Sequence, residues 1–222
     1  HDDFKHCDAI IFFGQNTGSN SPRFLHELQD CAKRGVKIVT FNPIREKGLE
    51  VFVNPQHPRE MLTGAETRIS CQYHQLRPGG DIAAILGLCK HVIAEDDRLW
   101  LQEQRNVVDH AFIRQHTTGY EAFAAKARGT SWEEIEAQSG LSRDALIAAA
   151  EVYIAARNTI GIYGMGLTQH VHGFENVAGF VNLLLLKGNI GREGAGISPV
   201  RGHSNVQGQR TVGITEKPGL AP

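Results

Sequence analysis

The stretch DAIIFFGQNTGSNSPRFLHELQDCAKRGVKIVTF, residues 8–41, predicts a strand, a helix and a second strand in succession. Residues 8–13 form a short apolar run that ends at Gly14, and such runs are typical of a parallel strand buried on both faces. Residues 36–41 form a second run of the same kind. Because parallel strands need a crossover between them, and crossovers are almost always right-handed, the stretch predicts a right-handed βαβ unit.

Apolar residues recur at helical spacing between these two strands and predict one amphipathic helix. We expect Ser21 to cap its first turn, Pro22 to occupy its first helical position, and Gly35 to end it. The residues of its apolar face are Phe24, Leu25, Leu28, Cys31 and Ala32.

Strands and helices continue to alternate along the chain. Residues 68–76 and 158–164 predict two more strands, and the turn at 78–81 opens a helix expected to reach about Ala94. The pattern of residues 96–157 predicts helix throughout. The predicted fold is α/β: a doubly wound, mostly parallel, Rossmann-like sheet flanked by helices, with a helical segment inserted around 96–157.

Helix caps and irregular segments refine this prediction. Ser131 and Glu134 form a capping box, and Ser142 caps the long helix that follows. Residues 42–68 contain three prolines and form a connection too long for an ordinary crossover, and such connections are usually functional. After a helix expected near 173–187, the chain becomes an irregular, glycine-rich run, which indicates backbone lying close to a ligand.

Composition predicts a soluble protein that binds something small. The 222 residues are 41% apolar and 21% charged, which excludes intrinsic disorder. A formal net charge of -1 leaves no basic field for nucleic acid or anionic lipid, and no apolar run is long enough to span a membrane. We therefore expect a small-molecule substrate, no nucleic-acid partner and no membrane span.

The cysteines are scattered, with no C-x-x-C and no zinc-ligand spacing, at Cys7, Cys31, Cys71 and Cys89. They predict buried thiols in a reducing, cytoplasmic compartment, although the sequence leaves a disulfide open. We expect no signal peptide. Because the chain begins at His1 without a methionine, we expect residues 1–222 to be one domain of a longer protein.

The loop GQNTGS, residues 14–19, follows the first strand and precedes a helix. Ligands of doubly wound sheets bind at this position, beyond the carboxyl ends of the strands. The loop is neither G-x-G-x-x-G nor a Walker loop, and Asn42 follows the second strand where a nicotinamide fold would prefer an acid. A plain strand–helix turn would look similar, so both interpretations stay open.

The turn Gly79-Gly80-Asp81 also has two interpretations. Asp81 can cap the helix that follows, as aspartate often does. Alternatively, its carboxylate can accept both N–H donors of a guanine edge, in a charged bidentate bond worth about 1.5–3 kcal/mol.

Two further groups of residues in the glycine-rich part could contact a ligand. Met165 lies between glycines and near Gln169, at the carboxyl end of a predicted strand. His170 and His172 form an H-x-H pair, but a metal is disfavoured because no third ligand lies nearby in the sequence. Arg201-Gly202-His203-Ser204-Asn205 predicts an anion site, because a guanidinium holds oxyanions by two bonds; a solvated loop is the alternative.

Five segments taken in order resemble one family of enzymes: AIIFFGQNTGSNSP, VKIVTFNP, PGGDIAAILG, IYGMGLTQHVHG and LLLLKGNIGREGAGISPVRGHSNVQG. They are similar to the molybdopterin-dependent oxidoreductases of the dimethyl-sulfoxide-reductase superfamily, above all to catalytic alpha subunits of the formate-dehydrogenase type. The resemblance covers nearly the whole chain, and its combination of strings is highly specific.

The resemblance implies a bis-molybdopterin guanine dinucleotide cofactor carrying molybdenum or tungsten. It implies that Arg201 orients the substrate beside the metal, with His203 two residues on, and that an electron-transfer partner subunit accepts electrons. A 4Fe-4S cluster and the metal's protein ligand are expected before residue 1, and a C-terminal barrel after residue 222. The cofactor contacts it implies are Gly14, Gln15, Asn16, Thr17, Ser19, Phe41, Asn42, Pro43, Gly79, Gly80, Asp81, Met165, Gly166 and Gln169.

The chain departs from the formate-dehydrogenase pattern at several positions. Thr17 stands where those enzymes usually have proline, and Asn42-Pro43-Ile44-Arg45 replaces their D-P-R string. Residues 46–68 form a longer segment, and His203 occupies a position that is glutamine in formate dehydrogenases. The substrate, formate or another small polar or anionic molecule, therefore stays open.

Two other functions compete with an oxidoreductase. The same scaffold could be a non-catalytic nucleotide-binding or interaction module, since a fold does not fix a function. A self-contained nicotinamide dehydrogenase is disfavoured by the missing G-x-G-x-x-G and acidic partner. By itself, without the metal ligand, the chain is expected to be inactive.

Overall fold

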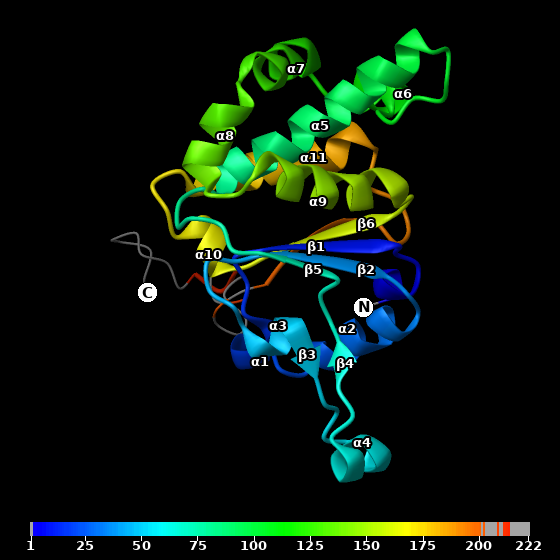
Figure 1. Cartoon of the computed structure of the whole chain (residues 1–222), viewed down its shortest axis with the longest axis vertical. Helices are drawn as coiled ribbons and strands as arrows, with labels where there is room; N and C mark the ends of the chain where they lie inside the picture. The colour runs from blue at the N-terminus through cyan, green and yellow to red at the C-terminus, as the bar shows by residue number, and fades with distance from the viewer. Residues whose placement is uncertain (1, 201, 203–207, 209–210, 214–222) are drawn as a thin grey trace.

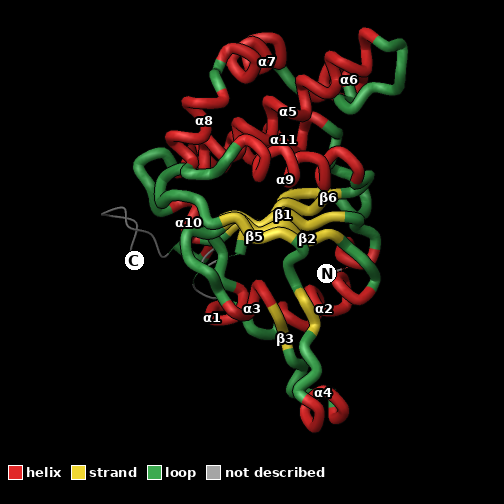
Figure 2. Tube along the Cα trace, viewed as in Figure 1, coloured by secondary structure: helices red, strands yellow, loops and turns green. Residues whose placement is uncertain are grey.

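A five-stranded parallel sheet forms the centre of the molecule, in the order β5-β2-β1-β6-β7 (Figure 1, Figure 2). The computed structural model describes residues 2–200, 202, 208 and 211–213. Because β2 and β5 lie on one side of β1, and β6 and β7 on the other, the sheet is doubly wound, and the predicted α/β fold is confirmed. The strands are Ala9–Phe13 (β1), Lys37–Phe41 (β2), Gln72–His74 (β5), Thr159–Tyr163 (β6) and Gly196–Pro199 (β7).

The two faces of the sheet bury separate hydrophobic clusters. In β1, Ile11 and Phe13 face one cluster and Ile10 and Phe12 the other, because successive strand residues point to opposite faces. Phe13 stacks on Phe41 of β2 with ring centroids 4.5 Å apart, which joins the two strands next to their carboxyl ends. The helices that cover the faces are α2 (Phe24–Lys33) on one side and α5 (Asp81–Leu101), α9 (Arg143–Ala155) and α11 (Gly173–Leu186) on the other.

An outer layer of helices covers α5 and α11 on the side away from the sheet (Figure 1). It consists of α6 (His110–His116), α7 (Tyr120–Gly129) and α8 (Trp132–Ser139), and it confirms the predicted helical insertion. Ser131 Oγ accepts from Glu134 N at 3.1 Å and Ser142 Oγ from Ala145 N at 3.3 Å, so both predicted caps are confirmed. No helix within the described residues is long and apolar enough to cross a membrane.

The structure corrects the sequence analysis in four respects. Ser21 ends the short helix α1 (Thr17–Asn20) instead of capping the next helix, which begins at Phe24. Asn16 Oδ1 caps α1 by accepting from Ser19 N at 3.1 Å, so a segment predicted as loop contains one helical turn. Helix α5 passes its predicted end at Ala94, and the run predicted as irregular contains β7, at a sheet edge where proline is tolerated.

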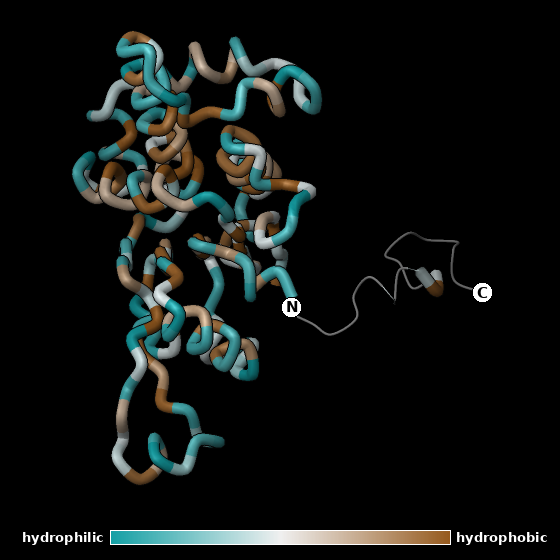
Figure 3. Tube along the Cα trace, turned by 90° about the vertical axis from the view of Figure 1, so that its right-hand side faces the viewer, coloured by the Kyte–Doolittle hydropathy of each residue, from teal (hydrophilic) through white to brown (hydrophobic). Residues whose placement is uncertain are grey.

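The long connection between β2 and β5 folds into a projecting arm, residues 51–68 (Figure 1, Figure 3). It follows the single-turn helix α3 (Lys47–Glu50), and strands β3 (Val51–Phe52) and β4 (Thr67–Arg68) pair antiparallel at its base. Helix α4 (Pro58–Thr63) forms its tip.

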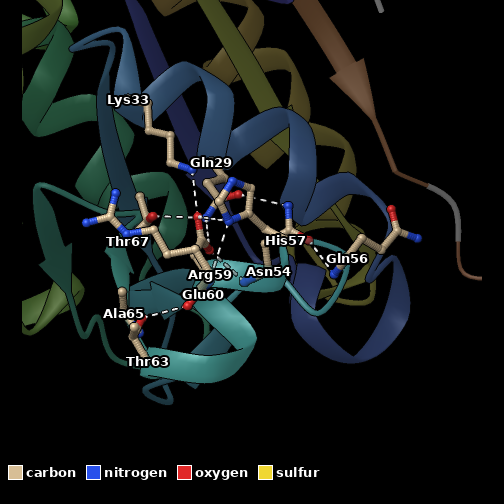
Figure 4. Close-up of polar contacts among 10 residues, drawn as sticks. All are labelled: Gln29, Lys33, Asn54, Gln56, His57, Arg59, Glu60, Thr63, Ala65 and Thr67. Carbon is tan, nitrogen blue, oxygen red and sulfur yellow. Dashed lines mark hydrogen bonds and ion pairs between the residues drawn. The ribbon is translucent and has the colours of Figure 1, made fainter.

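Polar side chains fix the arm to α2 at the carboxylate of Glu60 (Figure 4). Glu60 accepts from Lys33 Nζ, from the backbone N of Asn54 and from Gln29 Nε2, each at 2.9 Å. These donors, Lys33 above all, lower the pKa of Glu60 to about 2. Because the pKa is depressed in the fold, the stabilisation is present above the ordinary value of 4.5 and is lost as pH falls toward 2.

Glu60→Gln is expected to loosen the arm, because a neutral amide removes the charge that Lys33 faces and turns an N–H₂ group toward a donor. Backbone amide exchange in residues 51–68 should become about tenfold faster at neutral pH. Exposed Glu66 makes no such bonds within the described residues, so Glu66→Gln serves as the control. Equal exchange in the two variants would mean that Glu60 does not hold the arm.

Candidate functional site

The loops that follow β1, β2 and β6 converge on one cavity at the carboxyl edge of the sheet, at the switch point between β1 and β6. Its volume is about 270 Å³. Seven residues that the sequence analysis singled out line it together: Gly14, Gln15, Asn16, Asn42, Pro43, Met165 and Gly166. The structure thus brings together three segments that are far apart in the sequence.

Gly14 lets the loops after β1 and β6 lie backbone against backbone. Its φ is +58°, a left-handed value, and its carbonyl accepts from Gly166 N at 3.0 Å. A Cβ at position 14 would lie 2.5 Å from Leu167 N and 2.7 Å from the carbonyl carbon of Gly166. Only glycine fits such a contact, since both neighbouring atoms belong to the main chain.

Two polar side chains of the segment that follows β1 are buried without a partner among the described residues. Gln15 is 4% exposed and its Nε2 has no hydrogen bond within the described residues; the same holds for the hydroxyl of Thr17, which is 0% exposed. An unsatisfied buried donor costs about 1–3 kcal/mol, so such groups mark a place where a partner binds. Gln15 therefore fits a ligand that offers a hydrogen-bond acceptor at the cavity wall.

Asn16 and Ser19 bond to each other instead of facing the cavity with free groups. Asn16 Oδ1 accepts from Ser19 N, and its Nδ2 donates to Ser19 Oγ, both at 3.1 Å. Asn16 also lines the cavity, whereas Ser19 lines an adjacent one. Their hydrogen bonds set the conformation of the loop, as the plain-turn interpretation expects.

The side chain of Phe41, a predicted cofactor contact, lies in the hydrophobic core. Its side chain is fully buried between Phe13 and the ring of His74, whose centroid lies 4.9 Å away, so it does not line the cavity. It contributes through its backbone, because its carbonyl accepts from Gly14 N at 3.2 Å. Asn42 turns the chain after it by donating from Nδ2 to Ile44 O at 2.8 Å.

Asp81 is not the helix cap that one interpretation expected. Gly80 occupies the N-cap of α5, and Asp81 is the first helical residue, with 4% of its surface exposed. Gly79, Gly80 and Asp81 lie outside the lining of the cavity. Burial raises the pKa of Asp81, and His170 Nε2, 3.9 Å from Oδ2, opposes that rise.

The segment after β6 links Asp81 to the cavity. Met165 and Gly166 line the cavity at the start of the short helix α10 (Met165–Thr168), Gln169 is exposed at its end, and His170 follows beside Asp81. One short segment thus connects the two parts of the candidate site. Among the described residues, no three His, Cys, Asp or Glu side chains lie close enough to share a metal.

Arg201 and His203 lie outside the described residues. Gly202, between them, lines the cavity against Met165: a Cβ at position 202 would lie 3.4 Å from Met165 Cγ. The sequence analysis missed Asn20, Ile44 and Glu46, which also line it. For Ile44 and Glu46, the signal available in the sequence was the unusual length of the connection after β2. Tyr73 Oη fixes both residues, since it donates to Ile44 O at 2.7 Å and accepts from Glu46 N at 3.0 Å.

Comparison with known proteins identifies relatives that match nearly the whole chain. The profile of the molybdopterin oxidoreductase family matches residues 1–218. Protein YdeP of Escherichia coli strain K12 is 48% identical over 217 residues, which are 98% of this chain and 29% of that protein. The F420-dependent formate dehydrogenase subunit alpha of Methanocaldococcus jannaschii is 29% identical over 212 residues, 96% of this chain and 27% of that one.

A solved structure shares the fold. Acetylene hydratase from Pelobacter acetylenicus aligns with a TM-score of 0.68 and 18% identity, covering 86% of this chain and 23% of that one. The chain thus spans less than a third of the length of each of these proteins.

Proposed function

Because this chain belongs to the molybdopterin oxidoreductase family, we propose that it forms part of the binding site for a bis-molybdopterin guanine dinucleotide carrying molybdenum or tungsten. The observation that carries the proposal is the unpartnered Nε2 of Gln15 at a cavity between main-chain segments. Phosphate and pterin groups offer acceptors for that donor. The glycine-rich approach of the loops after β1 and β6 supports it, because a large flat or charged group needs bare backbone close by.

The chain's own residues bind and orient in this proposal. When bound, the cofactor supplies a metal that exchanges electrons with a substrate. Gln15 would donate to one of its acceptors, Met165, which is exposed and lines the cavity, would contact it, and Asp81 would accept from the guanine edge. The 4Fe-4S cluster, the metal's protein ligand and a C-terminal barrel belong to other parts of the full-length protein.

The substrate is proposed to be a small polar or anionic molecule, and electrons are proposed to pass to a partner subunit in the cytoplasm. Formate is the first candidate, because two of the relatives are formate dehydrogenases. Arg201 is proposed to hold the substrate by its planar guanidinium, with His203 as a proton donor or acceptor.

The cofactor is tested by composition. The full-length protein, purified from a host that makes molybdopterin cofactors, should contain molybdenum or tungsten and release two guanine nucleotides for each metal atom after mild acid hydrolysis. Guanine nucleotide without metal would instead indicate a non-catalytic nucleotide-binding module. Absence of both would overturn the proposal.

His203→Gln in the full-length enzyme tests the substrate proposal. An imidazole changes protonation near its ordinary pKa of about 6.5, whereas glutamine does not titrate. The variant should lose a limb of the pH–rate profile with a midpoint around 6–7, and its substrate preference should move toward formate when reduction of a dye acceptor is measured. An unchanged profile and substrate range, with metal content intact, would show that His203 takes no part in proton transfer.

A further inference from the structure

A second cavity, of about 780 Å³, lies at the opposite edge of the sheet from the proposed cofactor site. It lies near the amino end of β6, because Arg157 in its lining comes two residues before that strand, whereas the cofactor cavity lies beyond the carboxyl end. We call it the basic cavity, after four lining residues: Arg105, Arg157, Lys187 and Arg192. Asp109 is the one carboxylate among the described lining residues.

Lys187 places a cation at the floor of the basic cavity. Its Nζ donates to the carbonyls of Tyr153, Ile154 and Ala156 at 2.8, 2.6 and 2.6 Å, at the end of α9. Among the described residues, no carboxylate forms an ion pair with this amine; the partial negative charge of the helix end, the ring of Tyr153, whose centroid lies 5.1 Å from Nζ, and the more distant carboxylate of Asp8 balance it in part. Burial and the nearby guanidiniums of Arg192 and Arg105 lower the pKa of Lys187 to about 8.

The guanidinium groups of the basic cavity have N–H donors that form no hydrogen bond within the described residues. Arg192 donates from Nη2 to Asn189 Oδ1 at 2.7 Å and to the carbonyl of Arg157, which fixes its direction and leaves its other nitrogens available. The guanidiniums of Arg105 and Arg157 have no hydrogen bond or ion pair within the described part of the chain. Three guanidinium groups with available donors therefore line the same cavity as the amine of Lys187.

The nearby acids are committed to other donors. Asp109 Oδ1 accepts from Phe112 N at 2.9 Å, as the cap of α6. Asp8 accepts from the backbone N of Arg157 and Asn158 at 3.1 and 2.9 Å. Asp96 accepts from His110 Nε2 at 2.7 Å, so that imidazole is engaged as well. Four cationic side chains face one carboxylate in the described lining, so the basic cavity keeps a net positive charge.

We propose that the basic cavity binds a small anion with two or more phosphate groups, of about the size of a nucleoside diphosphate. A guanidinium group binds phosphate oxygens by two parallel hydrogen bonds. Three guanidinium groups and one amine match the charge of a diphosphate better than that of a single phosphate. The volume lies within the range of small-molecule sites. Apolar side chains in the lining, Val107 and Ile154 among them, leave room for an uncharged portion of the ligand.

Titration of pyrophosphate into the full-length protein tests the proposal by calorimetry, with citrate as an anion of similar charge but without phosphate. Pyrophosphate should bind about tenfold or more tightly than citrate. Arg105→Gln and Arg157→Gln should each weaken pyrophosphate binding about tenfold, because each removes a guanidinium group that has no other partner among the described residues. Lys187 is left unchanged, since its bonds to α9 support the fold.

Arg59→Gln is the matched control, because Arg59 is an exposed arginine on the arm, far from the cavity in the sequence and at the opposite end of the molecule from α6 (Figure 1). It should leave pyrophosphate affinity unchanged, and all three variants should keep the metal content of the parent protein. Equal weakening in the control, or equal affinity for citrate, would overturn the proposal. No binding would overturn it too, and would indicate that another part of the polypeptide fills the basic cavity.

Discussion

Gly14→Ala is expected to lower the free energy of unfolding by about 2–4 kcal/mol. Part of the loss, about 1–2 kcal/mol, comes from forcing an alanine into the left-handed conformation that Gly14 adopts at φ +58°. The rest comes from a clash, since the new Cβ would lie 2.5 Å from Leu167 N. Relief requires the loops after β1 and β6 to separate, which breaks the bond from Gly166 N to Gly14 O.

Gly64→Ala separates these two costs. Gly64 has φ +64°, close to that of Gly14, but nothing lies within 4 Å of a Cβ built on it. It should therefore lose only the conformational part when both variants are unfolded in urea, each compared with the parent protein. If the two variants lose the same amount, the contact between the loops contributes nothing to stability. If Gly14→Ala loses more, the metal content of the full-length variant should fall as well, because the same loops enclose the proposed cofactor.

The central strands could be predicted because their apolar runs need no tertiary context. β1 is an uninterrupted apolar run and is buried at all five positions, and β2, which is mostly apolar, is buried at four of five. β7 could not be predicted in this way, because an edge strand is half-exposed and its glycine and proline carry no strand signal. The predicted cap at Ser21 was wrong because Asn16 caps an earlier helical turn, α1, which ends at Ser21, and α2 begins only at Phe24.

The arm shows a different limit. Its length could be seen in the sequence, but its position could not, because the bonds that fix it join Glu60 to Gln29 and Lys33, which belong to another helix. Topology alone predicts that Gly14, Gln15 and the loop after β6 meet at the carboxyl edge of the sheet, where they line one cavity; their contact with a cofactor stays a prediction. Phe41 was assigned to the ligand although its side chain belongs to the core, since sequence adjacency to the site does not tell which way a side chain points.

Asp81 is expected to give the apoprotein a preference for GDP over ADP of about tenfold to a hundredfold. Guanine presents two adjacent N–H donors that a carboxylate can accept together, and adenine lacks that pair. Asp81 suits this role because it is nearly buried and Gly80, not Asp81, caps α5, so its carboxylate is not required for the cap. His170, 3.9 Å away, favours the ionised form that the bidentate bond needs.

Asp81→Asn should abolish the preference for GDP, since an amide can accept only through one oxygen and places its own donors against those of guanine. Asp144→Asn is the matched control: it removes an exposed acid from the first turn of α9 and should leave the preference intact. Because burial raises the pKa of Asp81, the preference in the parent protein should also weaken as pH falls and the carboxyl becomes protonated. Isothermal titration of both nucleotides against the three proteins measures all of these effects. Equal affinity for GDP and ADP in the parent would leave Asp81 with a purely structural role at the start of α5, and the guanine would then have to be recognised by other residues.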